Sequence, residues 1–232
     1  MNSDISIMTE LQRYWDSVLR GREEMEKCAK SIRHWRARMD DGTAGLAALD
    51  EEIKALKTEI GRKELDLADR DGKAKKLAQR RDMLKTEREL EALGHEVAAI
   101  NAERGALEED LIRLMDTLDG RNAARVTAAR DLEELSAQSG KDIAMLGERA
   151  ARFEKTIAEN QGKFDALLPT LGAAFRAKFQ KLTLSPNGIA VARVEGETCG
   201  GCRMQIPAHV AQDASREDRI VNCTNCGRFI YR

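Results

Sequence analysis

The stretch LAALDEEIKALKTEI at residues 46–60 places large apolar residues at alternating intervals of three and four. These residues are Leu46, Leu49, Ile53, Leu56 and Ile60. Alternating intervals of three and four form the a/d pattern of a coiled coil, in which two apolar series line one seam of a helix. The stretch therefore predicts a long helix that packs against a second helix.

Both apolar series keep one heptad phase far beyond this stretch. One series runs in steps of seven from Leu11 to Ala74. The other runs in the same way from Ile7 to Leu84. Residues 40–45 have the composition of a loop, but the phase continues through them, so we expect continuous helix there. An unbroken seven-residue repeat also predicts a left-handed supercoil.

A second pair of heptad series occupies residues 90–135 and predicts a second long helix. Near Ser139 the seam shifts by four residues, which indicates a stutter. The two helical segments are nearly equal in length, so we expect them to fold back on each other as an antiparallel hairpin. In that arrangement Arg70 is expected near Glu103. The other basic seam residue, Lys63, is expected near Glu108 and Glu109.

Four cysteines near the C-terminus form two Cys-x-x-Cys pairs that are separated by twenty residues. Two residues between thiolates let a tight turn aim both sulfurs at one tetrahedral ion. The spacing is that of a four-thiolate zinc ribbon. Four sulfurs also close the coordination shell, which leaves no position for a substrate. We therefore predict one structural Zn²⁺, with the ligands Cys199, Cys202, Cys223 and Cys226.

Three other interpretations of the cysteine pairs stay open on the sequence. Two disulfides would need an oxidising compartment, yet the first residues do not resemble a signal peptide. A thioredoxin-like redox pair would need a βαβ pattern, which surrounds neither pair. An iron–sulfur centre with cysteine ligands is the third. The fifth cysteine, Cys28, falls on the helical seam, where we expect a small apolar core residue.

The composition favours a long helical protein over one with a large globular core. Of the 232 residues, 34% are charged and 4% are aromatic, and the three prolines all lie in the last third. The net charge of −1 does not by itself indicate a nucleic-acid or membrane partner. No apolar run approaches the roughly 18 residues that span a bilayer. We expect a soluble, cytoplasmic protein.

Together these patterns predict a mainly α fold, with a long antiparallel coiled-coil hairpin and a small C-terminal, β-rich zinc ribbon. The expected hairpin covers residues 1–168, with its tip near residues 82–88. A linker helix and turn follow at residues 169–187, and the ribbon occupies residues 188–232. The ribbon has few large apolar side chains, so its folding is expected to depend on the metal.

Several features combine into a resemblance to a known bacterial family. The ribbon reads Cys199-Gly200-Gly201-Cys202, then Gln205-Ile206-Pro207, then Cys223-x-x-Cys226-Gly227-Arg228, with Tyr231 near its end. A coiled-coil hairpin precedes the ribbon, and Arg88-Glu89-Leu90-Glu91-Ala92-Leu93 follows the expected tip. In these features nearly the whole chain resembles the C4-type zinc ribbon domain proteins, formerly called domain of unknown function 164. Thr224 stands where the family commonly has proline.

The resemblance implies a helical hairpin with a zinc ribbon at its base and a function without catalysis. Relatives in flagellated and chlamydial bacteria are linked to the sigma factor RpoN and to flagellar or type III secretion components. One branch is also linked to flagellin message. No phosphate-binding Gly-rich loop, nucleophile elbow or His-Glu-x-x-His motif occurs in the sequence. We therefore expect no enzymatic activity, but an adaptor or chaperone that binds protein partners.

A basic cluster at the expected tip provides a second candidate function. Between residues 73 and 88, seven basic residues oppose only Asp82 and Glu87. The seven are Lys73, Lys75, Lys76, Arg80, Arg81, Lys85 and Arg88. Charge on a helix commonly keeps a face solvated, but this cluster also suits an acidic protein face or RNA. A nucleic-acid-binding regulator that uses the tip or the ribbon is thus the alternative function. A mechanical spacer and a homo-oligomer that covers the seam edges also stay open.

Overall fold

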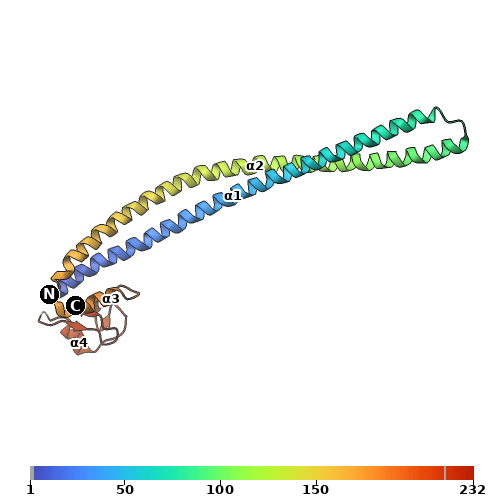
Figure 1. Ribbon diagram of the computed structural model, residues 1–232. Coiled ribbons are helices and arrows are strands. Elements are labelled where there is room, and N and C mark those ends of the chain that lie inside the picture. Colours follow the sequence, from blue (N-terminus) through green and yellow to red (C-terminus); the bar gives the residue numbers. More distant parts are fainter. Residues whose placement is uncertain (1–2, 217) are drawn as a thin grey trace. The chain divides into compact units, whose positions relative to one another are not determined.

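Two long helices make up most of the computed structural model, which describes residues 3–216 and 218–232 (Figure 1). Helix α1 spans Ser3–Arg81 and helix α2 spans Glu87–Leu167. Residues 82–86 form the turn between them, and helix α1 runs without a break through residues 40–45, as predicted. The mainly α fold with a small C-terminal sheet is therefore confirmed. The expected hairpin also included residues 1 and 2, which lie outside the described residues.

The chain divides into two compact units, and each contains parts of both long helices. The ribbon unit comprises Met1–His34 and Asp142–Arg232. The hairpin unit comprises Trp35–Lys141. The domain boundaries expected at residues 168 and 187 separated the hairpin, the linker and the ribbon according to their secondary structure. The compact units follow packing instead, because the ends of the long helices share one core with the ribbon.

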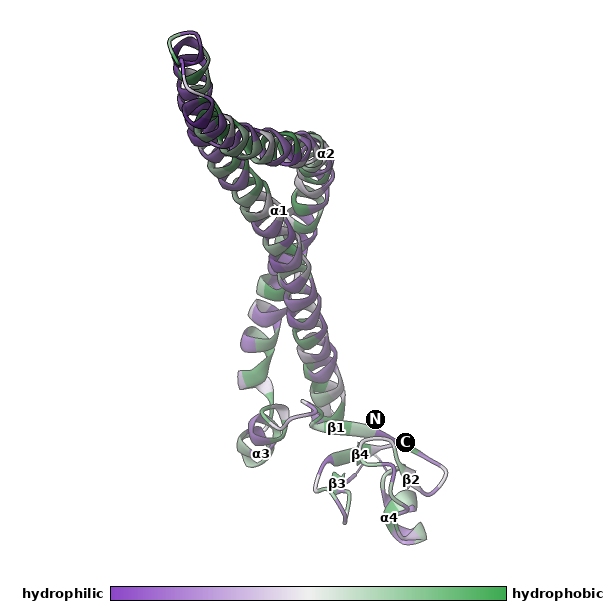
Figure 2. Ribbon diagram, turned by 90° about the vertical axis from the view of Figure 1, so that its right-hand side faces the viewer, coloured by the Kyte–Doolittle hydropathy of each residue, from purple (hydrophilic) through white to green (hydrophobic). Residues whose placement is uncertain are grey.

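In the hairpin unit, helices α1 and α2 pack along the predicted seam. Ile53, Ile60, Leu93 and Leu111 are the buried apolar side chains here. Both helices show alternating hydrophilic and hydrophobic residues along their length (Figure 2). This alternation is expected where one face of each helix contacts its neighbour and the other faces solvent.

Ion pairs across the seam fix how the two helices are aligned in the hairpin unit. The Nε atom of Arg70 lies 2.9 Å from the carboxylate of Glu103, which confirms that prediction. Lys63 donates a hydrogen bond of 2.7 Å to Asp110. The ion-pair partner of Lys63 is thus Asp110, one residue after the expected Glu109. The turn aligns the two helices in a register that is one residue away from the expected one.

The stutter predicted near Ser139 is visible as a change of register. A Cβ atom added to Gly42 would lie 2.9 Å from the side chain of Leu132. The Ser139 hydroxyl lies 2.9 Å from the sulfur of Met39. The two contacts are three residues apart on α1, from Gly42 to Met39, but seven residues apart on α2, from Leu132 to Ser139. Helix α2 therefore has four more residues than α1 between the same two contacts. Ser139 is fully buried, and its hydroxyl also lies 3.1 Å from the Ser136 carbonyl, which satisfies this polar group within the seam.

Four short strands in the ribbon unit form one sheet, in the order β2-β1-β4-β3. Strands β1 and β4 are parallel, and the two outer pairs are antiparallel. The strands are β1 (Val191–Glu195), β2 (Thr198–Cys199), β3 (Val221–Asn222) and β4 (Phe229–Tyr231). Two short helices accompany the sheet, α3 (Ala173–Thr183) and α4 (Ala208–Asp213). A 3-10 turn at Leu168–Thr170 follows α2, where Pro169 cannot continue the helix.

Neighbouring residues of β1 and β4 face two different cores. Val191 pairs with Phe229, and both belong to a core that includes residues of α1, α2 and α3. Ala192 pairs with Ile230, and both belong to a smaller core that surrounds the cysteines. This alternation follows from the two-residue period of a strand. The sheet therefore joins the metal centre to the ends of the long helices within the ribbon unit.

Candidate metal centre

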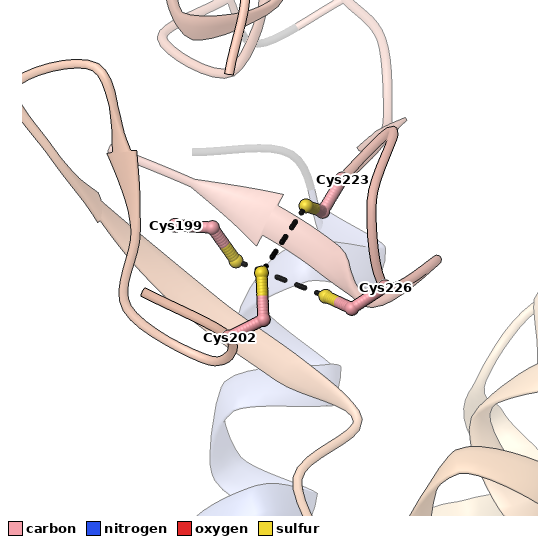
Figure 3. Close-up of side chains that lie close together, drawn as sticks. All are labelled: Cys199, Cys202, Cys223 and Cys226. Atoms are coloured by element: carbon pink, nitrogen blue, oxygen red, sulfur yellow. Dashed lines mark hydrogen bonds between the residues drawn. The ribbon is translucent and has the colours of Figure 1, made fainter. Parts of the chain in front are cut away.

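Two turns of the ribbon bring the four predicted cysteines together, with their sulfurs turned toward one another (Figure 3). All four sulfurs lie within 4.8 Å of one another. The Cys199 sulfur is 3.9 Å from that of Cys226, and the Cys202 sulfur is 3.8 Å from that of Cys223. Tetrahedral zinc with Zn–S bonds of about 2.3 Å requires sulfurs about 3.8 Å apart. A disulfide needs about 2.05 Å, so the geometry fits one tetrahedral ion and not two disulfides.

The two cysteine turns repeat one backbone pattern. The Arg203 N–H donates to the Cys199 carbonyl at 2.7 Å, and the Gly227 N–H donates to the Cys223 carbonyl at 2.9 Å. Arg203 and Gly227 both adopt left-handed backbone angles, with φ of 60° and 71°. Glycine adopts this conformation freely, whereas a side chain is strained there. The glycine was recognisable in the sequence, but no residue type marked Arg203 as its counterpart.

The glycines of the first turn are needed because other atoms approach them closely. A Cβ atom on Gly200 would lie 2.6 Å from the Arg193 carbonyl oxygen, which accepts a 2.9 Å hydrogen bond from the Gly200 N–H. A Cβ atom on Gly201 would lie 2.7 Å from the Arg228 side chain. The first turn is thus held directly against strand β1 and has no room for larger residues.

Burial and hydrogen bonding affect the four thiols unequally. Burial raises the pKa of the Cys199 thiol to about 12. Burial also opposes ionisation of Cys226, but hydrogen bonds from the Arg228 backbone and side chain lower the pKa of that thiol to about 7. The Arg228 Nε–H also donates to the Ile189 carbonyl at 2.9 Å, which orients the side chain. Four thiolates at neutral pH therefore require a bound cation, and zinc binding releases their protons.

The residues present fit a structural zinc ion with a closed ligand set. Cys199 and Cys223 are buried, and Cys202 and Cys226 are half-buried. A bound Zn²⁺ would link the turn after strand β2 to the turn after strand β3. Four protein sulfurs complete the tetrahedron, so such an ion stabilises the ribbon and offers no coordination position to a substrate.

Gln12 of α1 holds the loop that leads into the ribbon, and no sequence pattern indicated this role. Its side-chain amide donates to the Gly188 carbonyl at 2.9 Å and to the Asp16 carboxylate at 2.6 Å. Its carbonyl oxygen accepts from the backbone N–H groups of Ala190 at 2.7 Å and Val191 at 3.3 Å. Gln12 is 7% exposed, so these bonds replace water for otherwise buried backbone groups.

Aromatic side chains complete the contact between the ribbon and the helices of its unit. The rings of Phe175 and Phe229 meet edge to face, with their centroids 6.0 Å apart. Phe179 is fully buried in the same core. Trp15 donates its indole N–H to the Thr183 carbonyl at 3.1 Å. No pattern in the sequence indicated this contact, because Thr183 lies 168 residues further along the chain.

The seven basic residues of the tip all lie in the hairpin unit, and all are exposed. Five belong to the end of α1, Lys85 lies in the turn, and Arg88 lies in the first turn of α2. Within the part of the chain that the structure describes, Lys73 is the only one of the seven with an ion-pair partner, Asp69 at 2.8 Å. The tip therefore presents a basic surface to solvent.

Sequence comparison identifies the ribbon. Residues 198–230 match the C4-type zinc ribbon domain family, and this region contains all four cysteines. The fold and the site together define a protein with a C4-type zinc ribbon attached to a helical hairpin. No curated protein sequence matches the chain significantly. None of the helices in residues 3–216 and 218–232 is both long and apolar enough to cross a membrane.

Three solved structures resemble the chain over nearly its whole length. CT398 from Chlamydia trachomatis aligns with a TM-score of 0.89 and 19% identity, covering 98% of this chain and 97% of that chain. The HP0958 protein from Helicobacter pylori gives 0.65 and 16% identity, covering 99% and 97%. A protein from Mycobacterium smegmatis gives 0.60 and 19% identity, covering all of both chains. At these identities the likeness establishes the fold.

Proposed function

We propose that this chain is a non-catalytic adaptor or chaperone that binds protein partners along its hairpin. The observation that carries the proposal is an exposed row of apolar side chains on α2, formed by Ile112, Met115 and Val126, which we call the apolar stripe. They are 60%, 53% and 67% exposed. At 3.6 residues per turn, they lie within about 60° of one another around the helix axis. They lie off the seam, and the exposed Asp119 lies on the same face between Met115 and Val126. Apolar side chains gathered on one exposed face are a feature of protein-binding surfaces.

The chemistry of the metal centre supports a function without catalysis. A four-sulfur site leaves its ion no open position, so the ion cannot activate water or polarise a substrate. The three histidines, which are the commonest acid–base residues of active sites, are spread along the chain at positions 34, 95 and 209. The ribbon then serves as a folded module, and the hairpin as the partner surface.

The family resemblance suggests which partners to test first. These are the sigma factor RpoN and components of flagellar or type III secretion systems. A helical partner of this kind would contact the apolar stripe through the apolar face of its own helix.

Affinity capture after nuclease treatment tests the proposal. The full-length, zinc-loaded chain is used as bait in an extract of cells that make it, and captured proteins are identified by mass spectrometry. We expect Met115→Lys to lose the captured proteins and Thr117→Lys, on another face of α2, to retain them. Capture that disappears on nuclease treatment, or that is equal for both variants, would show that the apolar stripe does not bind proteins.

The exposed basic tip favours one second candidate, a nucleic-acid-binding regulator. Lysine and arginine side chains can neutralise phosphates without reading sequence. However, no phenylalanine, tyrosine or tryptophan occurs between Trp35 and Phe153, so the tip offers none of these rings as a stacking platform for bases. Replacing Lys75, Lys76, Arg80 and Lys85 by glutamine should weaken RNA binding and flatten its salt dependence. Unchanged affinity would remove this candidate.

A further inference from the structure

We propose that the hairpin tip binds an acidic amphipathic helix of a partner protein in an apolar groove between the end of α1 and the start of α2. The proposal rests on the adaptor function above and specifies the chemistry of one partner. It concerns a site separate from the apolar stripe, so the two surfaces can be tested independently.

The groove exists because one of the two seam series of α1 loses its large apolar residues at the tip, while the other keeps Leu77 and, in the turn, Leu84. The series that begins at Leu11 passes from Leu67 to Ala74 and then to Arg81. Positions 74 and 81 of α1 therefore present no large apolar side chain to α2, where Leu90 is 41% exposed and Val97 is half-buried, whereas Leu93 is buried. The groove that results has a volume of about 670 Å³.

The lining of this groove is mainly apolar and open to solvent. Leu77 on α1 faces Leu90, Leu93 and Val97 on α2 across it. Leu90 is 41% exposed although it occupies a seam position. Gly94 also lines the groove, and a Cβ atom added there would meet nothing within 4 Å. Apolar side chains of a partner could therefore enter without displacing atoms of this chain.

The dimensions suit a short helical segment. The groove extends from Ala74 to Asp82 on α1 and from Leu90 to Val97 on α2. Eight residues of helix correspond to about 12 Å. Two turns of a partner helix have the same length and present apolar residues at i, i+3 or i+4, and i+7, which is the usual pattern of a helix bound in a groove.

The charges at the rim determine the polarity of the partner. Arg81 and Asp82 both line the groove, and Lys73, Lys76 and Glu96 line a smaller groove of about 430 Å³ beside Leu77. Around these linings, the seven exposed basic residues of the tip outnumber Asp82 and Glu87 between residues 73 and 88, so the rim as a whole is basic. Of the acids that begin α2, Glu89 accepts a hydrogen bond from the Thr86 hydroxyl. An acidic edge on the partner, directed toward α1, would complement this basic rim.

An apolar floor with a basic rim favours a protein helix over RNA. Phosphates would satisfy the rim but leave the exposed Leu90 and the half-buried Leu77 and Val97 in contact with solvent or polar sugars. An acidic amphipathic helix satisfies both features at once, since its leucine-rich face covers the floor and its carboxylates face the rim. A second copy of this chain would bring two basic rims together, which opposes association.

Two matched glycine substitutions test the groove. Gly94→Leu fills it, whereas Gly120→Leu adds the same side chain to the same helix at another site with open space around it. Leucine has a higher helix propensity than glycine, so neither variant is expected to unfold the hairpin. Circular dichroism of both full-length, zinc-loaded variants verifies this.

The probes are two synthetic amphipathic peptides with identical leucine spacing, one with glutamates and the other with lysines on the polar face. We expect the acidic peptide to bind at least tenfold more tightly in fluorescence anisotropy, and its affinity to fall with added salt. Gly94→Leu should lose at least tenfold in affinity, and Gly120→Leu should not change it. Lys76→Glu combined with Arg81→Glu should reverse the preference between peptides. Equal binding of both peptides, or no effect of Gly94→Leu, would overturn the proposal.

Two further measurements separate this proposal from its competitors. A single-stranded RNA oligonucleotide that binds more tightly than the acidic peptide, or self-association that Gly94→Leu abolishes, would assign the groove to another occupant. If Gly94→Leu retains every captured protein in the affinity capture described above, the groove is not a docking site, although the adaptor function stands. If the unmodified chain captures no protein, the adaptor function itself fails.

Discussion

Gln12 offers a direct test of how the ribbon is held in its unit. The substitution Gln12→Met keeps the volume of the side chain but removes the bonds to the carbonyl of Gly188 and the N–H groups of Ala190 and Val191. A buried backbone group left without a partner costs about 1–3 kcal/mol. The Val191 bond is long, at 3.3 Å, so we count two strong losses and expect the free energy of unfolding of the ribbon unit to fall by about 2–6 kcal/mol.

Urea unfolding at a fixed free zinc concentration measures this loss. Trp15 reports on the ribbon unit because it hydrogen-bonds to Thr183, and a Trp35→Phe background removes the other tryptophan signal. The exposed residue Gln79 provides the control, since Gln79→Met should change stability by less than about 0.5 kcal/mol. A loss below about 1 kcal/mol for Gln12→Met would refute the assignment of this anchor.

Three further predictions concern the metal centre and the seam. Cys223→Ser should abolish stoichiometric zinc in elemental analysis and unfold the ribbon, because structural zinc contributes directly to folding. Gly227→Ala should destabilise the ribbon by about 1–2 kcal/mol, whereas Arg203→Gly should stabilise it by up to about 1 kcal/mol in the same urea assay; equal effects would contradict the strain argument. A hydrogen bond and the charge of Lys63 lower the pKa of Asp110, so this pair stabilises the hairpin above about pH 4 and is lost on acidification. NMR titration of Lys63→Met should show the pKa of Asp110 rising, and no rise would disprove the pairing.

Regular patterns allowed most of the fold to be predicted from the sequence. The heptad series predicted a helix through residues 40–45 despite their loop-like composition, because a loop would have reset the phase. The cysteine spacing predicted which four sulfurs come together, since the turn that joins each pair is local. The stutter near Ser139 was also visible as a change in the spacing of apolar residues.

The features that sequence analysis missed depend on contacts between distant residues. Gln12 has the appearance of an ordinary polar helix residue, and its role arises only when the loop at Gly188 packs beside it. Arg203 carries a backbone conformation that its residue type does not indicate. The groove at the tip was hidden because the basic residues dominated the local pattern, while the apolar floor combines Leu77 with residues of the other helix.

The anchoring of the N-terminal helix has a consequence for synthesis of the chain. Met8 and Leu11 are fully buried in the ribbon unit, and the bond from Gln12 to Gly188 spans 176 residues. A ribosome that adds about 5–20 residues per second reaches Gly188 roughly 10–35 s after Gln12. Throughout that interval the nascent amino-terminal segment lacks its binding partner. Translation that stops before residue 188 thus yields products in which Met8 and Leu11 lack their partners in the ribbon, and exposed apolar surface of this kind promotes aggregation.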